Sequence, residues 1–232
     1  MTADQLDLPL PSAEAIAEFG DSLAKAQHYV ELLATDGVTR GLIGPRETAR
    51  LWDRHLLNCA LVAELVPDQG ELVDIGSGAG LPGIVLAMLR PRLHVVLLEP
   101  LLRRSVFLEE CVSALDLPNA TVLRARAEEK AASWISADVA TARAVAPLDR
   151  LVGWAAGLLR PGGELLAIKG QSAAAELEAA GPVLSGLGVR SAEVLQAGHG
   201  RVVSATTIVR VVMGGHGREE RAGAQRSRRG VA

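Results

Sequence analysis

Two stretches near the start of the chain carry apolar residues at helical spacing. In residues 12–37 and again in residues 45–66 the apolar side chains recur every three or four positions. This spacing places them on one face of an amphipathic helix. Ser12 is a suitable N-cap for the first stretch, and Gly37 is a suitable stop. We therefore expect residues 1–66 to form a helical cap.

From Glu71 onward, short β-rich apolar runs alternate with helical stretches. Such alternation builds a mostly parallel sheet with helices on both faces. The last two runs are joined by a polar, glycine-rich turn and should form a hairpin. The expected strands are residues 72–75, 94–98, 120–123, 139–142, 164–168, 189–195 and 202–211, and the expected helices between the first five strands are 82–90, 103–115, 128–136 and 148–159. The pattern predicts an α/β domain over residues 67–213, with one antiparallel strand at the edge of a seven-stranded sheet.

Composition and charge narrow the class of protein. Hydrophobic residues make up 49% of the chain and charged residues 22%, which is a globular balance. The longest apolar runs are far shorter than the roughly 20 residues that cross a bilayer, and the N-terminus has no apolar stretch typical of a signal peptide. A net charge of −3 argues against non-specific coating of nucleic acid. We expect a soluble, cytoplasmic protein.

The last segment, residues 214–232, differs in composition from the rest. It is rich in Arg, Gly, Ser and Ala and has almost no large apolar residue. Such a segment cannot bury enough apolar surface to fold and should be a disordered basic tail. It is either a solvated terminus or an arm that touches RNA.

The cysteines and tryptophans are expected in the core. Cys59 and Cys111 lie far apart and outside any Cys-x-x-Cys pattern, so neither a disulfide framework nor a metal site is expected. Trp52, Trp134 and Trp154 are too dispersed to form a stacking platform for single-stranded RNA.

The first strand of the predicted sheet runs directly into a glycine-rich loop. Gly76, Gly78 and Gly80 let the backbone turn sharply and let a ligand approach closely, while the free N–H groups of the next helix suit an anion. Dinucleotide-binding loops follow the pattern G-x-G-x-x-G, but here the third glycine comes one residue early and Leu81 takes its place. Asp74 precedes the first glycine by two residues. These details favour S-adenosylmethionine over a dinucleotide.

Two further segments suit the nucleoside part of that ligand. Glu99 ends the second strand about 20 residues after the loop, where a carboxylate binds ribose hydroxyls. Residues 126–129 follow the third strand, at the position where the loop meets the adenine edge. The alternative for these residues is a helix start with favourable acidic side chains.

Several cations lie at or near the carboxyl edge of the predicted sheet. Arg103, Arg104, Arg143 and Lys169 are each either an ordinary surface cation or a group that holds RNA phosphates or the acceptor atoms O6 and N7 of guanine. Arg143 and Lys169 each follow directly on a strand, which favours a functional role. His55 falls on an apolar helix face and is either a core histidine or an RNA contact.

Together these motifs resemble the RsmG (GidB) family of small-subunit ribosomal RNA guanine-N7 methyltransferases over roughly residues 15–212. The matching segments are Asp74–Ile84, Arg103 with Phe107-Leu108, Arg126–Glu129, Arg143-Ala144, Lys169–Gln171 and Arg54-His55. The resemblance implies a Rossmann-like class I methyltransferase, S-adenosylmethionine as cofactor, and 16S ribosomal RNA or the small ribosomal subunit as partner. It also implies cofactor contacts at Gly76, Leu81, Ala127, Glu128 and Arg143.

The chemistry of guanine N7 agrees with the residues present. N7 has a free lone pair, so methylation requires alignment and electrostatics but no base. The candidate residues fall into three groups: catalytic Arg143 and Lys169; cofactor-binding Asp74, Gly76, Ser77, Gly78, Gly80, Leu81, Glu99, Ala127, Glu128 and Arg143; and RNA-binding His55, Arg103, Arg104 and Lys169. No metal is expected, and the protein is expected to be a monomer. The alternatives are methylation of another RNA base or a small molecule, a nucleotide-dependent oxidoreductase, and a non-catalytic RNA-binding protein.

Overall fold

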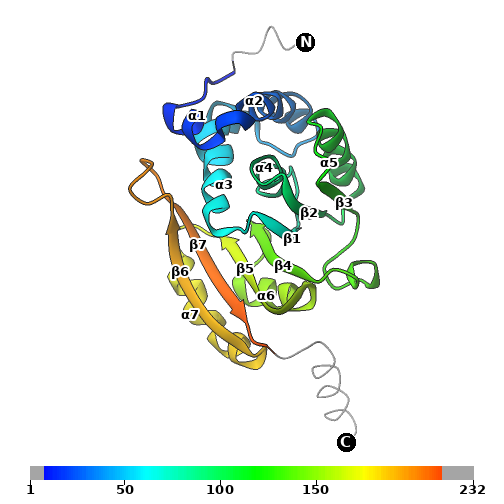
Figure 1. The fold of residues 1–232 in the computed structure, drawn as a ribbon, viewed down its shortest axis with the longest axis vertical. Coiled ribbons are helices and arrows are strands. Elements are labelled where there is room, and N and C mark those ends of the chain that lie inside the picture. The colour runs from blue at the N-terminus through cyan, green and yellow to red at the C-terminus, as the bar shows by residue number, and fades with distance from the viewer. Residues whose placement is uncertain (1–7, 216–232) are drawn as a thin grey trace, which may run out of the picture.

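A computed structural model describes residues 8–215, which are built around one seven-stranded sheet (Figure 1). The order of the strands is β3-β2-β1-β4-β5-β7-β6. The strands are β1 Gln69–Ile75, β2 Arg92–Leu98, β3 Ala120–Leu123, β4 Ala137–Arg143, β5 Leu159–Ile168, β6 Val189–Ala197 and β7 Thr206–Met213. The chain runs from β1 through β2 to β3 at one edge of the sheet. It then crosses to β4, on the other side of β1, and continues from there to β5. The strand order therefore reverses between β1 and β4, where open α/β sheets bind ligands.

One strand is antiparallel, as predicted, but its predicted place at the edge of the sheet is wrong. The strands β1 to β5 are parallel, and β7 pairs antiparallel with both β5 and β6. The strand β7 thus lies inside the sheet, with β6 at the edge. Its apolar side chains explain this order, because β7 is buried along most of its length and β6 is largely exposed.

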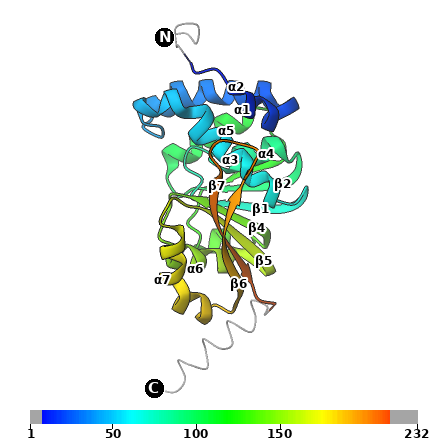
Figure 2. The same ribbon diagram turned by 90° about the vertical axis from the view of Figure 1, so that its left-hand side faces the viewer.

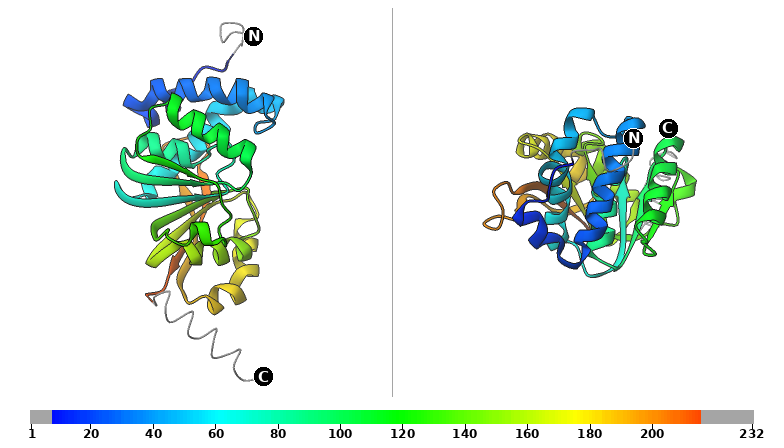
Figure 3. Two further views of the ribbon diagram at one scale, coloured as in Figure 1. Left: turned by 90° about the vertical axis from the view of Figure 1, so that its right-hand side faces the viewer. Right: turned by 90° about the horizontal axis from the view of Figure 1, so that it is seen from above.

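Helices cover both faces of the sheet, as Figure 3 shows. The helices α4 Gly83–Leu89 and α5 Leu102–Ala114 pack on one face together with the N-terminal segment. On the other face lie α6 Leu148–Leu158 and α7 Ala173–Gly186. The chain pattern did not predict α7, a helix that is rich in small residues and contains Pro182.

The N-terminal segment is helical, as predicted, although its two helices are irregular. Ser12 caps the first, since its Oγ accepts a hydrogen bond from Ala15 N at 3.2 Å. The elements are α1 Ala13–Phe19, a 3₁₀ turn η2 Gly20–Ser22, α2 Leu23–Leu32, a π turn η3 Leu33–Gly37, a 3₁₀ segment η4 Pro45–Arg50, a π segment η5 Leu51–Leu57, α3 Asn58–Ala60 and a 3₁₀ segment η6 Leu61–Leu65.

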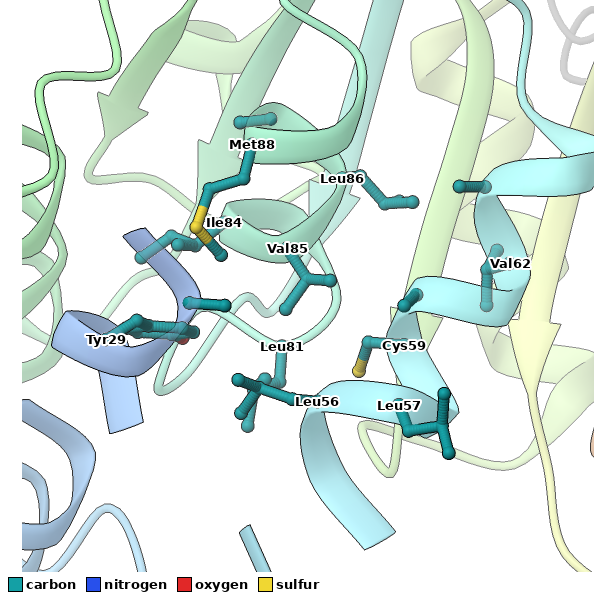
Figure 4. Close-up of a cluster of buried hydrophobic side chains, with 14 of the residues drawn as sticks. Tyr29, Leu56, Leu57, Cys59, Val62, Leu81, Ile84, Val85, Leu86 and Met88 are labelled. Carbon is teal, nitrogen blue, oxygen red and sulfur yellow. The ribbon is translucent and has the colours of Figure 1, made fainter. Parts of the chain in front are cut away.

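This segment shares a core with the sheet domain. Tyr29 and Leu56 pack beside Leu81, Ile84 and Met88 of the glycine loop and α4 (Figure 4). The same core holds Cys59 and Cys111, which are free and buried as predicted.

The turn between β6 and β7 is tied to the N-terminal segment at a second place. Gly198 N donates to Glu64 Oε1 at 2.9 Å, and Val203 N donates to Glu14 Oε1 at 3.1 Å. Figure 2 shows this turn reaching up toward the N-terminal helices. The cap therefore adheres to the sheet domain at the glycine loop and at the last hairpin.

Three local predictions were wrong or shifted. The helix expected over residues 128–136 is only a short 3₁₀ turn, η7 Lys130–Ala132, because few apolar side chains in this stretch reach the core. Trp134 is 54% exposed, which contradicts its expected burial, whereas Trp52 is buried. The last strand begins at Thr206 instead of residue 202. Among residues 8–215, no helix is long and apolar enough to cross a membrane. The predicted basic tail lies outside the described residues from 216 on.

Candidate functional site

A cavity of about 550 Å³ opens at the carboxyl edge of the sheet, beside the point where strand order reverses. Loops from four parallel strands and the N-terminal segment form its walls. The lining includes Leu42, Ile43, Glu47, His55, Gly76–Ala79, Leu81, Glu99–Leu101, Arg104, Ala125–Glu128, Arg143–Val145 and Trp154. Most of the predicted cofactor residues therefore surround one space.

Asp74 lies behind this cavity and supports the glycine loop. Its carboxylate, which is 1% exposed, accepts hydrogen bonds from Ser77 Oγ at 2.6 Å, Gly83 N at 3.0 Å and Thr141 Oγ1 at 3.0 Å. Burial raises the pKa of Asp74 to about 6, although all three hydrogen bonds oppose that rise. Asp74 is not part of the cavity lining; it fixes the two ends of the loop.

The three glycines of the loop have different roles. A Cβ on Gly80 would lie 2.7 Å from Tyr29 Oη, and one on Gly76 would lie 2.8 Å from Val145 Cγ1, so packing requires glycine at both positions. A Cβ on Gly78 would meet no heavy atom closer than 3.7 Å. Gly78 lines the cavity and Gly80 does not. Of the three glycines, only Gly76 and Gly78 line the cavity, so only these two can bring their backbone close to a ligand there.

Tyr29 holds the loop from the side of the N-terminal segment. Its buried hydroxyl donates to Ala79 O at 2.5 Å, and burial raises the pKa of Tyr29 well above its usual value. An aromatic side chain within an apolar stripe carries no signal of a specific contact, so this role of Tyr29 could not be predicted from the sequence.

Glu99 is a buried carboxylate directed into the cavity. It accepts from Gly78 N at 3.0 Å and from Leu101 N at 2.9 Å, and Arg104 Nη1 lies 3.9 Å away. Each carboxylate oxygen retains a lone pair for a further donor. Ala127 and Glu128 line the same cavity.

A second cavity, of about 890 Å³, adjoins the first. The two share His55 and residues 143–145 at the end of β4. The second cavity is also lined by Arg54, Asn58, Ala146, Pro147, Ile168, Lys169, Gly170 and Glu176. The structure thus brings the candidate catalytic residues Arg143 and Lys169 into one wall.

His55 is neither an apolar core residue nor a free surface residue. Its side chain is 12% exposed; Nε2 lies 2.9 Å from Glu47 Oε2, and Nδ1 lies 3.2 Å from Arg143 Nη2. Burial and the positive charge of Arg143 lower the pKa of His55, against the opposing effect of Glu47. The hydrogen bond to His55 lowers the pKa of Glu47.

Lys169 is directed at the loop after β4. Its Nζ donates to Ala146 O at 2.9 Å and to Glu176 Oε2 at 2.7 Å. The bond from Lys169 lowers the pKa of Glu176. Within the loop, Ala144 has a φ of +55°, a backbone conformation that costs energy for a residue with a Cβ. The loop is therefore held in place against local strain.

The other two predicted RNA contacts are separated by the structure. Arg104 lines the first cavity, but Arg103 is exposed and borders neither cavity. In residues 8–215 no group of three or more His, Cys, Asp or Glu side chains is arranged to hold a metal ion.

Comparison with known proteins shows which protein family this chain is similar to. Residues 22–203 match the family model GidB, described as rRNA small subunit methyltransferase G. The chain is 58% identical over 204 residues to the ribosomal RNA small subunit methyltransferase G of Thermobifida fusca, covering 88% of this chain and 86% of that one. It is 53% identical over 212 residues to the protein of the same name from Streptomyces coelicolor, covering 91% and 89%.

Solved structures agree on the fold. A putative S-adenosyl-L-methionine-dependent methyltransferase from Methanococcus maripaludis superposes with a TM-score of 0.53 at 15% identity, over 81% of this chain and 94% of that one. At this identity the likeness supports the class I methyltransferase fold.

Proposed function

Because the chain belongs to the rRNA small subunit methyltransferase G (GidB) family, we propose that it transfers a methyl group from S-adenosylmethionine to N7 of a guanine in 16S ribosomal RNA. The observation that carries this proposal is the pair of adjoining cavities. One is lined by the glycine loop and Glu99, the other by Arg54 and Lys169, and Arg143 lies in the wall that they share.

The first cavity fits the cofactor. S-adenosylmethionine supplies a methyl group on a positively charged sulfur, which makes that group an electrophile. The backbone of Gly76 and Gly78 offers close approach, and the lone pairs of Glu99 suit the two ribose hydroxyls. We assign the remaining contacts to Ser77, Leu81, Ala127 and Glu128, which line the same cavity.

The second cavity fits a guanine presented by RNA. Arg143 suits the acceptor atom O6 or a neighbouring phosphate, which leaves the lone pair of N7 free for the methyl group, and Arg54 extends the positive wall to the surface. The carboxylate of Glu176 is already bound to Lys169 and Ser172. No proton has to leave N7 before methylation, so a site without a free carboxylate in this wall can align the base and the methyl group.

In this proposal Asp74, Gly80 and Lys169 support the two loops and do not contact the cofactor or the RNA. Asp74 and Gly80 shape the loop from behind the cavity, and Lys169 supports the loop that carries Arg143. We propose that the protein acts as a cytoplasmic monomer on 16S ribosomal RNA or on the small ribosomal subunit, with residues 1–66 as a helical cap on the catalytic domain 67–213.

Labelled S-adenosylmethionine tests the proposal. The purified protein is incubated with small ribosomal subunits from cells that lack its gene, with subunits from normal cells as control. We expect label in 16S ribosomal RNA of the first sample only. Calorimetry with S-adenosylmethionine and with NADH is run beside it. Binding of NADH but not of S-adenosylmethionine would replace the proposal with an oxidoreductase, and RNA binding without transfer would replace it with a non-catalytic protein.

A further inference from the structure

The guanidinium of Arg143 is held by an imidazole instead of a carboxylate. Its Nη2 lies 3.2 Å from His55 Nδ1. Among residues 8–215, no Asp or Glu oxygen forms an ion pair with Arg143 within 4.0 Å, whereas Arg160, Arg201 and Arg210 each pair with carboxylates. In the described part of the chain, Arg143 therefore forms no direct ion pair with a carboxylate at the wall shared by both cavities.

This contact determines which ring nitrogen of His55 carries the proton. An arginine only donates, so Nδ1 must accept and is unprotonated. The proton of the neutral ring is then on Nε2, which donates to Glu47 Oε2 at 2.9 Å. Glu47 thereby selects the tautomer that Arg143 needs, as carboxylates do for other histidines with an assigned role.

We propose, on the basis of the function proposed above, that Glu47 and His55 are positioning residues that hold Arg143 in the wall between the two cavities. The Glu47 carboxylate fixes the imidazole, and the imidazole orients the guanidinium without cancelling its charge. A carboxylate in place of His55 would orient Arg143 too, but it would neutralise the field that the guanidinium directs at the substrate. Lys169 secures the other side of the loop through Ala146 O.

The charges around His55 predict an acid limb in the pH profile. Glu47 and Arg54 face it from its own segment, and Arg143 faces it from the end of β4; the paired Lys169 and Glu176 line the same second cavity. As the pH falls through the lowered pKa of His55, Nδ1 gains a proton. It then repels Arg143 and no longer accepts its hydrogen bond, so methyl transfer should slow.

Two substitutions of His55 each retain one of its two hydrogen bonds, the bond to Arg143 or the bond to Glu47. In His55→Asn the side-chain oxygen replaces Nδ1 and retains the bond to Arg143, whereas in His55→Gln the amide replaces Nε2 and retains only the bond to Glu47. We expect His55→Gln to lower the single-turnover rate at saturating S-adenosylmethionine by about 10- to 100-fold, the range seen when such an orienting partner is lost. We expect His55→Asn to stay within about fivefold of wild type and to lose the acid limb.

His94→Asn is the matched control. His94 also lies beside a carboxylate, Glu71 at 3.6 Å, but it is near the start of β2 at the opposite edge of the sheet. We expect wild-type transfer, a wild-type pH profile and unchanged affinity for S-adenosylmethionine for this variant. Equal rates for His55→Asn and His55→Gln, or an acid limb that persists in His55→Asn, would overturn the inference.

A second readout keeps the inference separate from the proposed function. Side-chain ¹⁵N NMR of the full chain at neutral pH should show His55 with an unprotonated Nδ1 and a protonated Nε2, and Glu47→Gln should weaken that preference. The opposite tautomer in wild type would refute the inference even if the protein methylates ribosomal RNA. The expected tautomer in a protein that does not methylate ribosomal RNA would leave the arrangement intact and refute the proposed function alone.

Discussion

The loop after β1 and the loop after β4 border the same cavity but are held in different ways. The first, residues 76–81, is fixed from behind by the buried carboxylate of Asp74 and the hydroxyl of Tyr29. The second, residues 143–147, is held by ionisable side chains at the cavity wall, His55 on one side and Lys169 on the other.

This difference indicates that the first loop serves binding of the cofactor and the second loop serves methyl transfer to the substrate. Buried hydrogen bonds and required glycines give the first loop one shape, which suits a cofactor that is the same in every cycle. Partly exposed ionisable groups hold the second loop, so its polar groups remain available to a polyanionic substrate and sensitive to pH. Substitutions should therefore affect folding and cofactor binding at the first loop, and methyl transfer at the second.

Gly80→Ala should have the largest effect on folding. The new Cβ would overlap Ile84 and Tyr29 at a φ of +93°. We expect the free energy of unfolding to fall by about 2–4 kcal/mol, from strain and overpacking together, as measured by urea denaturation. Gly153→Ala, where a Cβ meets no atom within 4 Å in α6, is the control. A Gly80→Ala protein as stable as that control would show that the loop is not rigidly packed.

Gly78→Asp should leave the fold largely intact and remove cofactor binding. Gly78 has free space around its Cα, but that space is the cavity, and its N–H contacts Glu99. A second carboxylate there should weaken S-adenosylmethionine binding by about 100-fold or more, since close like charges cost several kcal/mol. Calorimetry measures the affinity and circular dichroism the fold. Unchanged affinity would place the cofactor elsewhere.

Arg143→Ala should act on transfer. We expect the single-turnover rate at saturating cofactor to fall about 100-fold, the effect typical of losing one electrostatic contact to a reacting group. The melting temperature should change by only a few degrees, because the side chain forms no ion pair with a carboxylate in the described part of the chain. A large loss of stability with normal transfer would contradict this role.

The last prediction concerns the pH dependence of stability that Asp74 contributes. Its folded-state pKa, about 6, lies above its usual value of 3.8, so its contribution to stability is present below pH 4 and is lost as the pH rises through 6. Asp74→Asn removes this titration and can still bond to Ser77, Gly83 and Thr141. Relative to wild type, the variant should gain up to about 3 kcal/mol between pH 4 and 7. Denaturation across that range would refute the raised pKa if the difference stayed constant.

Much of the fold could be predicted from the sequence because its signals are local. The glycine loop, the strand before it and Glu99 lie close together along the chain, and each has a strict backbone or burial requirement. The position of β7 inside the sheet could not be predicted in this way, since it depends on competition between two strands for the same neighbour. The exposed Trp134 was misplaced for a similar reason, because large apolar residues are usually but not always buried.

The candidate site residues that directly follow strands could be predicted from the sequence, whereas the contacts between distant segments of the chain could not. Arg143 and Lys169 were found because they follow strands directly. The contacts that decide their roles come from Glu47, which acts through His55, and from Glu176, and neither carboxylate belongs to a recognised motif. Asp74 and Gly80 were predicted to contact the ligand, but neither residue lines the cavity. Only the packing of the whole domain distinguishes a residue that shapes a loop from one that lines it.

The most direct test of the account is to identify the methylated atom. Small ribosomal subunits lacking the modification are treated with the protein and S-adenosylmethionine, and the RNA is digested to nucleosides and mapped. The account predicts one product, 7-methylguanosine, at one position in 16S ribosomal RNA, and none with the Gly78→Asp protein. A methyl group on another atom or base, or 7-methylguanosine scattered over many positions, would contradict it.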